Sequence, residues 1–201
     1  MEMNTEANLD RLILIDERNR TLGSAEKHAA HRNGSLHRAF SIFLFDDAGR
    51  LLLQRRAAGK YHSGGLWANT CCGHPRPHEP TGRAAARRLH EELGLATALT
   101  FAFHARYRAA LDHGMIENEL VYVFAGRLPA GPIRPDPMEA DAIGFVTLDE
   151  LEEQMRVSPR RYTVWLRHYL RQHGDQLRCM ADGLRWPRHR STLVSNHDLR
   201  P

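Results

Sequence analysis

Residues 69–95, NTCCGHPRPHEPTGRAAARRLHEELGL, join a loop rich in Gly, His and Pro to a helical segment. The apolar spacing of residues 81–93 predicts an amphipathic helix, and Gly94 is the residue type expected just beyond a helix C-terminus. In the loop, Gly73 lets the backbone approach closely, so that Cys72 and His74 can converge on one small volume. A rigid turn with a buried thiol would fit the same loop, and both interpretations stay open for this segment alone.

The predicted helix places an acid beside its apolar stripe. On a wheel of 100° per residue, Ala85, Leu89 and Leu93 share one face, and Arg88 and Glu92 border it one turn apart. Glu92 is therefore expected at the edge of the core, where a metal ion could compensate its charge. The alternative is a solvated ion pair between Arg88 and Glu92, worth less than ~1 kcal/mol.

A second acidic pattern, IENELVYV, lies in the strand predicted over residues 116–126. Alternate residues of a strand share a face, so Glu117 and Glu119 point the same way as Val121 and Val123. Two carboxylates that face a core repel each other unless a cation or a proton lies between them. Oxygen ligands combined with imidazoles suit Mg²⁺, Mn²⁺ or Fe²⁺. An edge strand that exposes both acids to water is the alternative.

Histidines and basic residues nearer the N-terminus could complete such a site. His31 and His37, six residues apart across a predicted turn, could face one metal ion, although two surface histidines would show the same spacing. Guanidinium and ammonium groups suit a diphosphate, and those near the predicted hairpin are Lys27, Arg55, Arg56 and Lys60. Neither a GxxxxGK[ST] loop nor a GxGxxG fingerprint is present.

Strands and helices are predicted in alternation along the rest of the chain. We expect strands over residues 9–16, 101–107 and 116–126, and a hairpin of residues 39–45 and 50–55. Residues 61–80 are expected to be an ordered loop and residues 131–137 a proline-rich connector, followed by helices at 149–155 and 159–172. This mixture predicts an α/β (α+β) fold. The expected parts are a flexible N-terminus (1–8), a single domain (9–172) and a basic tail (173–201).

Length and composition exclude several classes of protein. The 201 residues, 42% of them hydrophobic, suffice for one domain with a core and do not fit a disordered chain or a coiled coil. The net charge of +4 permits anionic ligands but lacks the dense basic stripe of a nucleic-acid binder. No apolar run reaches the ~18 residues of a membrane span. Three cysteines, two of them adjacent, cannot form a paired disulfide framework, so we expect a reducing, cytoplasmic location.

The combined spacing resembles the Nudix box: Gly73-x5-Glu79-x7-Arg87-Arg88-Leu89-x-Glu91-Glu92-x-Gly94-Leu95. It departs at Arg88, where Nudix hydrolases carry a glutamate that helps to hold catalytic metals, and this cation argues against hydrolysis. With Asn-x-x-Cys-Gly-His-Pro at 69–75 and Glu-Asn-Glu at 117–119, the chain looks like a type I isopentenyl diphosphate isomerase over residues 9–169. The resemblance implies a Nudix-like α-β-α sandwich around a mixed β-sheet, with N- and C-terminal additions.

The resemblance also implies roles for the matching residues. A catalytic thiol falls on Cys72, whereas Cys71 is treated as structural. A His3Glu2 site for Mn²⁺ or another divalent cation would consist of His31, His37, His74, Glu117 and Glu119. Mg²⁺ on the substrate diphosphate would be met by Glu92 and the main-chain carbonyl of Cys72. The diphosphate contacts match Lys27, Arg56, Lys60 and Arg88, and the active-site aromatics match Tyr107 and Trp165.

The implied reaction isomerises isopentenyl diphosphate to dimethylallyl diphosphate in isoprenoid biosynthesis. It is a 1,3-allylic proton shift, in which protonation at one carbon and deprotonation at another pass through a tertiary carbocation. Cys72 and Glu119 could be the acid and base on opposite faces of the allylic unit, in a pocket that excludes water. Tyr107 could relay the proton of Glu119, and the face of Trp165 could stabilise the cation by roughly 2 kcal/mol. Helical spacing equally allows a core role for Trp165.

Two other functions fit parts of the sequence. A Nudix hydrolase would cleave nucleoside diphosphate derivatives with Mg²⁺, and Arg88 counts against it. A non-enzymatic protein that binds RNA or a partner would use the basic tail, with Arg185, Arg188 and Arg190. That protein would leave the combination of Cys72, His74, Glu117 and Glu119 without a role. We therefore expect an isomerase with a small-molecule substrate, as a monomer or a dimer, without a nucleic-acid or membrane partner.

Overall fold

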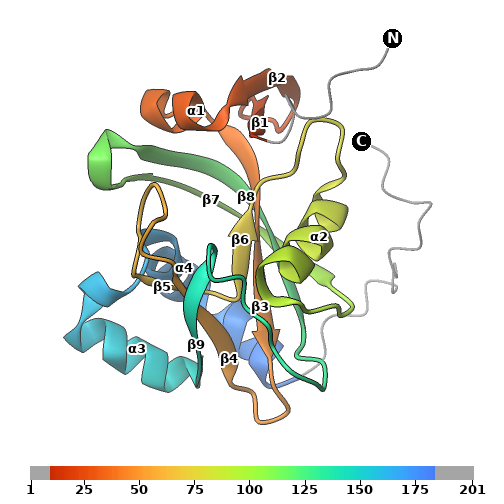
Figure 1. The fold of residues 1–201 in the computed structure, drawn as a ribbon, viewed down its shortest axis with the longest axis vertical. Coiled ribbons are helices and arrows are strands. Elements are labelled where there is room, and N and C mark those ends of the chain that lie inside the picture. Colours follow the sequence, from red (N-terminus) through yellow and green to blue (C-terminus); the bar gives the residue numbers. More distant parts are fainter. Residues whose placement is uncertain (1–9, 184–201) are drawn as a thin grey trace.

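The computed structural model describes residues 10–183, which fold into a mixed β-sheet covered by helices on both faces (Figure 1). The strands are β1 (Arg11–Ile15), β2 (Thr21–Glu26), β3 (His37–Phe45), β4 (Leu51–Arg56), β5 (Trp67–Ala68), β6 (Cys71–Gly73), β7 (Thr100–Ala110), β8 (Ile116–Arg127) and β9 (Ala140–Val146). The helices are α1 (Lys27–Asn33), α2 (Thr81–Leu93), α3 (Leu148–Val157) and α4 (Val164–Ala181), with single 3₁₀ turns at Asp112–Gly114 and Pro159–Arg161. The expected α+β sandwich around a mixed sheet is confirmed.

Strand β3 lies at the centre of the sheet. It pairs in parallel with β8 along its whole length and antiparallel with β6, where Ser41 is opposite Cys72. The register places His37 opposite Glu119 on β8, and Glu119 opposite Tyr107 on β7. Three predicted site residues therefore form one row across β3, β8 and β7.

Alternation along β3 sends its side chains into two separate cores. Phe43 and Phe45 pack in the core that α3 and α4 cover, together with Leu151 of α3 and Leu166 of α4. Phe40, Ile42 and Leu44 pack in the other core, whose helical contributions, from α2, are Ala84, Ala85, Leu89 and Leu93. Each of these two cores lies between the sheet and one of the two helical layers of the sandwich.

Helix α2 has the bounds expected from its apolar spacing, residues 81–93. Gly94 ends it in the left-handed conformation, with φ of 66°, and its backbone N–H donates to the carbonyl of His90. A left-handed backbone favours glycine, because a Cβ atom would strain it. The predicted hairpin is also confirmed, although β3 begins at His37, two residues earlier than expected.

Several elements were missed or misplaced. The expected loop at 61–80 contains β5 and β6, strands of two and three residues that are defined by pairing with β4 and β3. Strand β2, helix α1 and strand β9 were not predicted, because α1 has only seven residues and β2 and β9 lack regular alternation.

The expected helix at 159–172 begins too early, and its predicted end falls at a kink at His173 (φ −135°), beyond which α4 continues. Pro159 begins a separate 3₁₀ turn, and the chain is extended at Tyr162, which bridges Trp67. Helix α4 starts at Val164 and continues to Ala181, with Leu177 fully buried. The domain boundary at residue 172 stays a prediction; α4 crosses it, while residues 1–8 and 184–201 lie outside the described part. No helix within residues 10–183 is long and apolar enough to cross a membrane.

Candidate active site

A pocket of about 220 Å³ lies where the sheet meets α1, α2 and α4. Its wall includes Lys27 of α1, Ser41 of β3, Arg88 of α2, Tyr107 of β7 and Trp165 of α4. All of the site residues that the family resemblance implies line this pocket except His31 and His37, which are buried with no exposed area. The pocket therefore gathers residues that are more than 130 positions apart in the chain.

The two adjacent cysteines point to opposite sides of β6. Cys71 is fully buried in the core under α2, whereas Cys72 lies in the pocket wall. Gly73 makes this arrangement possible, because a Cβ atom there would lie 2.8 Å from the ring of Phe40. Strand alternation thus separates a structural cysteine from one that faces the pocket.

The thiol of Cys72 lies in a network of hydrogen bonds. Its sulfur donates to Oδ1 of Asn69 at 3.1 Å and lies 3.4 Å from Oγ of Ser41. Ser41 in turn lies 2.8 Å from the hydroxyl of Tyr169. Burial raises the pKa of Cys72 to about 12, although Ser41 and Asn69 act in the opposite direction. The thiol is therefore protonated at neutral pH and held in one orientation.

Five predicted metal ligands meet at one end of β3 and β8. One ligand atom from each residue lies within 4.8 Å of all the others, in the set His31, His37, His74, Glu117 and Glu119. His31 comes from α1 and His37 from the first residue of β3, on either side of the left-handed Gly34 that ends α1. His74 directly follows β6, and the two acids alternate on β8.

The donor set fits a divalent cation. Nδ1 of His31 lies 2.7 Å from the carbonyl of Lys27, and Nδ1 of His37 lies 2.8 Å from that of Ser35. A carbonyl only accepts, so both rings donate through Nδ1 and, when neutral, leave a lone pair on Nε2. Both Nε2 atoms, and Oε2 of Glu117, are buried without a hydrogen-bond partner. Ligation by a divalent cation would satisfy all three atoms.

The two carboxylates of this group differ in their partners. Glu119 accepts hydrogen bonds from the Tyr107 hydroxyl at 2.7 Å and from Nε2 of His74 at 2.8 Å. Burial, followed by the charge of Glu119, raises the pKa of Glu117 well above its usual range. A bound cation would favour the ionised form of Glu117, which again fits a metal site.

A fourth histidine lies beside the five-residue group. Nε2 of His62 is 3.5 Å from Oε1 of Glu117, and its ring meets that of Trp165 edge to face at 5.9 Å between centroids. Trp165 has 3% of its surface exposed and contacts the core under α4, and the guanidinium of Arg56 lies 5.3 Å from its ring centre. Trp165 therefore combines core packing with a place in the pocket wall.

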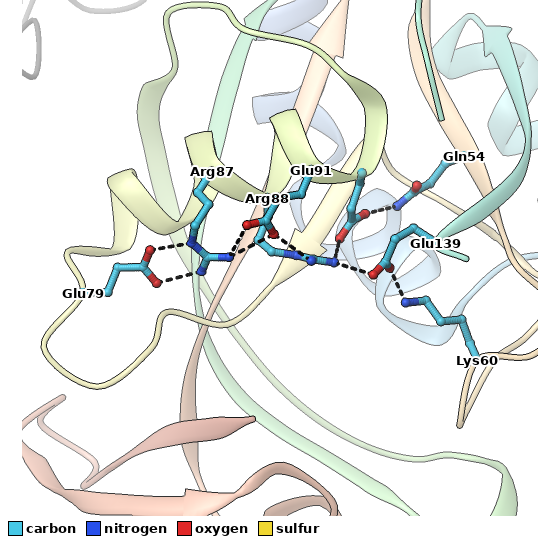
Figure 2. Close-up of polar contacts among 8 residues, drawn as sticks. Gln54, Lys60, Glu79, Arg87, Arg88, Glu91 and Glu139 are labelled. Carbon is cyan, nitrogen blue, oxygen red and sulfur yellow. Dashed lines mark hydrogen bonds and ion pairs between the residues drawn. The ribbon is translucent and has the colours of Figure 1, made fainter. Parts of the chain in front are cut away.

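Three basic residues that line the pocket, Lys60, Arg87 and Arg88, are paired with acids (Figure 2). Arg88 contacts Oε2 of Glu91 at 2.9 Å and Oε1 of Glu92 at 2.5 Å, so the ion pair that the helix wheel allowed is present. Glu92 is buried and also accepts from Nε2 of Gln54 at 3.0 Å. Arg55, in contrast, is not among the residues that line the pocket, and it pairs with Asp141.

Sequence reasoning missed residues that only the tertiary structure brings to the site. Ser41 of β3 contacts Cys72, and Tyr169 of α4 contacts Ser41. His62 lies in a segment that was expected to be irregular. Glu139 contacts both Lys60 and Arg88. A single acid beyond a proline-rich connector carries no local signal, whereas the extra histidine in Tyr61-His62 could have been tested as a ligand.

Comparisons with known proteins identify the family to which this chain is related. Residues 35–166 match the NUDIX domain family. The chain is 52% identical over 157 residues to isopentenyl-diphosphate Delta-isomerase 1 of Aromatoleum aromaticum, which covers 78% of this chain and 88% of that protein. It is 48% identical over 165 residues to the isopentenyl-diphosphate Delta-isomerase of Burkholderia multivorans, with 82% of this chain and 93% of that protein covered.

Solved structures with a similar fold include two bacterial proteins. A protein of Deinococcus radiodurans superposes with a TM-score of 0.67 at 17% identity, over 81% of this chain and 99% of the other. A MutT NUDIX hydrolase of Burkholderia pseudomallei superposes with a TM-score of 0.55 at 26% identity, over 69% and 98% of the two chains. The likeness to the Deinococcus protein concerns the fold.

Proposed function

This chain belongs to the isopentenyl-diphosphate Delta-isomerases of the Nudix superfamily, and from that premise we propose how its pocket performs the reaction. The enzyme converts isopentenyl diphosphate to dimethylallyl diphosphate, the step that provides the allylic five-carbon unit of isoprenoid biosynthesis. Cys72 and Glu119 are the two groups that exchange protons with the substrate. The observation that carries this assignment is that Cys72 faces the pocket while Cys71 faces the opposite core.

The reaction needs an acid and a base that act on different carbons of the same allylic unit. One group adds a proton to the terminal carbon, and the other removes a proton from the carbon next to the diphosphate-bearing one, so the double bond moves by one position. Cys72 and Glu119 come from separate strands on either side of β3, which suits two faces of a substrate. Positioned acid and base groups of this kind contribute about 10²–10⁴-fold each.

Supporting residues hold these two groups in place. Tyr107 donates to Oε2 of Glu119 and can pass a proton to or from it. Asn69 and Ser41 fix the direction of the Cys72 sulfur. Trp165 is among the residues that line the pocket, and its ring would stabilise the tertiary carbocation by roughly 2 kcal/mol once the site is desolvated. Water has to stay out, since it would capture the cation.

Two divalent cations complete the proposed site. The group of three histidines and two glutamates would hold Mn²⁺, Mg²⁺ or another divalent ion, whose charge would favour the ionised forms of Glu117 and Glu119 side by side. Glu92 and the main-chain carbonyl of Cys72 would meet Mg²⁺ on the substrate diphosphate. The diphosphate itself would be bound by the basic residues of the pocket, Lys27, Arg56, Lys60 and Arg88.

We further propose that the protein works in the cytoplasm on a small-molecule substrate, without nucleic-acid partners. Cys71, Cys72 and Cys179 are free thiols, which suits a reducing compartment.

The assignment of Glu119 is tested with Glu119→Gln. This variant keeps the side-chain shape but loses the proton-transfer group, so isomerisation should fall to near zero while the circular dichroism spectrum is unchanged. Free phosphate is measured in the same reactions, because the wild-type enzyme should release none. Phosphate release by the wild type would instead indicate a Nudix hydrolase, and an active Glu119→Gln variant would remove Glu119 from the chemistry.

A further inference from the structure

Glu139 is held by its backbone at the wall of the pocket. It lies directly before β9, where its N–H donates to the carbonyl of Asp136 at 2.9 Å. Its own carbonyl accepts from the N–H of Ala57 at 3.0 Å. Backbone hydrogen bonds to two different segments therefore fix this residue. Its side chain is 19% exposed and lines the pocket.

The carboxylate of Glu139 bridges two of the pocket's cations (Figure 2). One oxygen pairs with Nζ of Lys60, and the other lies 3.0 Å from Nη2 of Arg88. Arg88 also contacts Glu91 through Nη1 and Glu92 through Nη2. With Glu139, three carboxylates therefore contact its guanidinium group. Burial alone would raise the pKa of Glu139, but Lys60 and Arg88 bring it below its usual range, and the group is ionised at neutral pH.

A diphosphate would need the same N–H donors. Phosphate oxygens bind guanidinium and ammonium groups through short, charge-assisted hydrogen bonds, and here those donors already face an internal anion. A phosphate that approaches Lys60 and Arg88 must therefore displace Glu139 or lie beside it, with like charges in contact. Either outcome weakens the binding of a highly charged anion.

We propose that Glu139 is a specificity-determining residue that competes with the diphosphate for Lys60 and Arg88 and thereby makes tight binding depend on Mg²⁺. A diphosphate that carries Mg²⁺ has less net negative charge and suffers less repulsion from the carboxylate. A free diphosphate meets the full repulsion. This inference rests on the proposed function, since it assumes that Lys60 and Arg88 bind the diphosphate.

Glu139, and not Glu92, is the acid suited to this role. The Glu92 side chain has 4% of its area exposed and also accepts a hydrogen bond from Gln54, so the protein holds it from two sides. The Glu139 side chain is more exposed and touches both proposed diphosphate ligands, whereas Glu91 pairs with Arg88 and Arg87 and is not among the residues that line the pocket. Glu91→Gln is therefore a matched control that removes the same charge from the same network.

The test measures binding of inorganic pyrophosphate by isothermal titration calorimetry, with and without added Mg²⁺, on the full-length metal-loaded enzyme. Without Mg²⁺, Glu139→Gln should bind pyrophosphate about tenfold more tightly than the wild type, a difference of ~1.4 kcal/mol. With Mg²⁺ the two proteins should differ much less, so the variant gains less affinity from the ion. Glu91→Gln frees one donor of Arg88 but leaves Lys60 paired with Glu139, so it should tighten binding clearly less than Glu139→Gln does. Unchanged circular dichroism verifies that each variant folds.

A second variant separates this inference from the proposed function. Lys60→Met removes one proposed diphosphate ligand and should weaken binding in both conditions. If Lys60→Met binds as the wild type does, or if no protein binds pyrophosphate, the diphosphate site is misassigned and the inference falls with it. If Lys60→Met weakens binding but Glu139→Gln binds equally or less tightly than the wild type, the diphosphate site stands and the competition is wrong.

Discussion

Replacing each of the two adjacent cysteines by alanine gives opposite expectations for activity. Cys72 faces the pocket, and because we propose that it transfers a proton, Cys72→Ala should remove a catalytic group. The loss of one positioned acid or base costs about 10²–10⁴-fold in rate, which corresponds to roughly 3 to 5 kcal/mol of barrier height. Cys71 is sealed in the core under α2, and Cys71→Ala should leave the rate within a few-fold of the wild type.

The two variants should lose similar amounts of unfolding free energy, so a difference in activity between them reports on catalysis. Cys71→Ala deletes one buried sulfur from the α2 core, at a cost of ~1 kcal/mol. Cys72→Ala leaves Oδ1 of Asn69 without the thiol donor, at a similar cost of ~1 kcal/mol. For a chain of this size, each should lower Tm by roughly 2–4 °C. Unfolding therefore cannot account for a large difference in activity between them.

The assay follows dimethylallyl diphosphate formation at saturating isopentenyl diphosphate and Mg²⁺, with Tm measured on the same preparations. The expected result is a loss of at least about a hundredfold for Cys72→Ala and near wild-type turnover for Cys71→Ala. Comparable losses in both variants, or an active Cys72→Ala, would refute the assignment that strand alternation supports.

Three further outcomes follow from the contacts described. Removing the metal ion from the histidine–glutamate group with a chelator should lower Tm, because two buried carboxylates would lose their counter-charge. Added Mn²⁺ should restore the Tm. An unchanged Tm after chelation would speak against a metal ion at this group. Glu92→Gln should raise the Mg²⁺ concentration needed for half-maximal rate with little change at saturation, and an unaltered Mg²⁺ dependence would remove Glu92 from the site. Glu79 accepts hydrogen bonds from Nε and Nη2 of Arg87 at 2.7 and 2.8 Å, which outweigh burial and lower its pKa. That ion pair contributes its stability above the ordinary carboxyl pKa of 4.5 and loses it as the pH falls through the lower folded-state value. Glu79→Gln should therefore cost about 1 kcal/mol at pH 7 in thermal melts and nothing in strong acid, and a gap that persists in acid would contradict this origin.

Much of the sheet and of the site follows from alternation and helical spacing. Glu117 and Glu119 share a face with Val121 and Val123, and the structure places all four side chains inside. Residues 81–93 form a helix whose apolar stripe packs on the sheet, with Gly94 as its cap. These features could be predicted because they are local: the first depends on alternation within one strand, and the second on the apolar spacing of one helix and on the glycine that ends it.

What could not be predicted depends on partners distant in the chain. Strands β5 and β6 have too few residues to show a period, and they exist because β4 and β3 pair with them. Helix α4 starts late because Tyr162 bridges Trp67, and Thr163 donates to the carbonyl of Trp67 at 2.9 Å. The carboxylate of Glu139 reaches Lys60 and Arg88 only through the path of the connector before β9.

The most direct test of the reaction is proton NMR of isopentenyl diphosphate in D₂O with the purified enzyme and Mg²⁺, together with a measurement of free phosphate. We expect the alkene signals of isopentenyl diphosphate to be replaced by those of dimethylallyl diphosphate, with deuterium incorporated and no phosphate released. Phosphate release, or a substrate that stays unchanged, would contradict a proton-shift isomerase in this pocket.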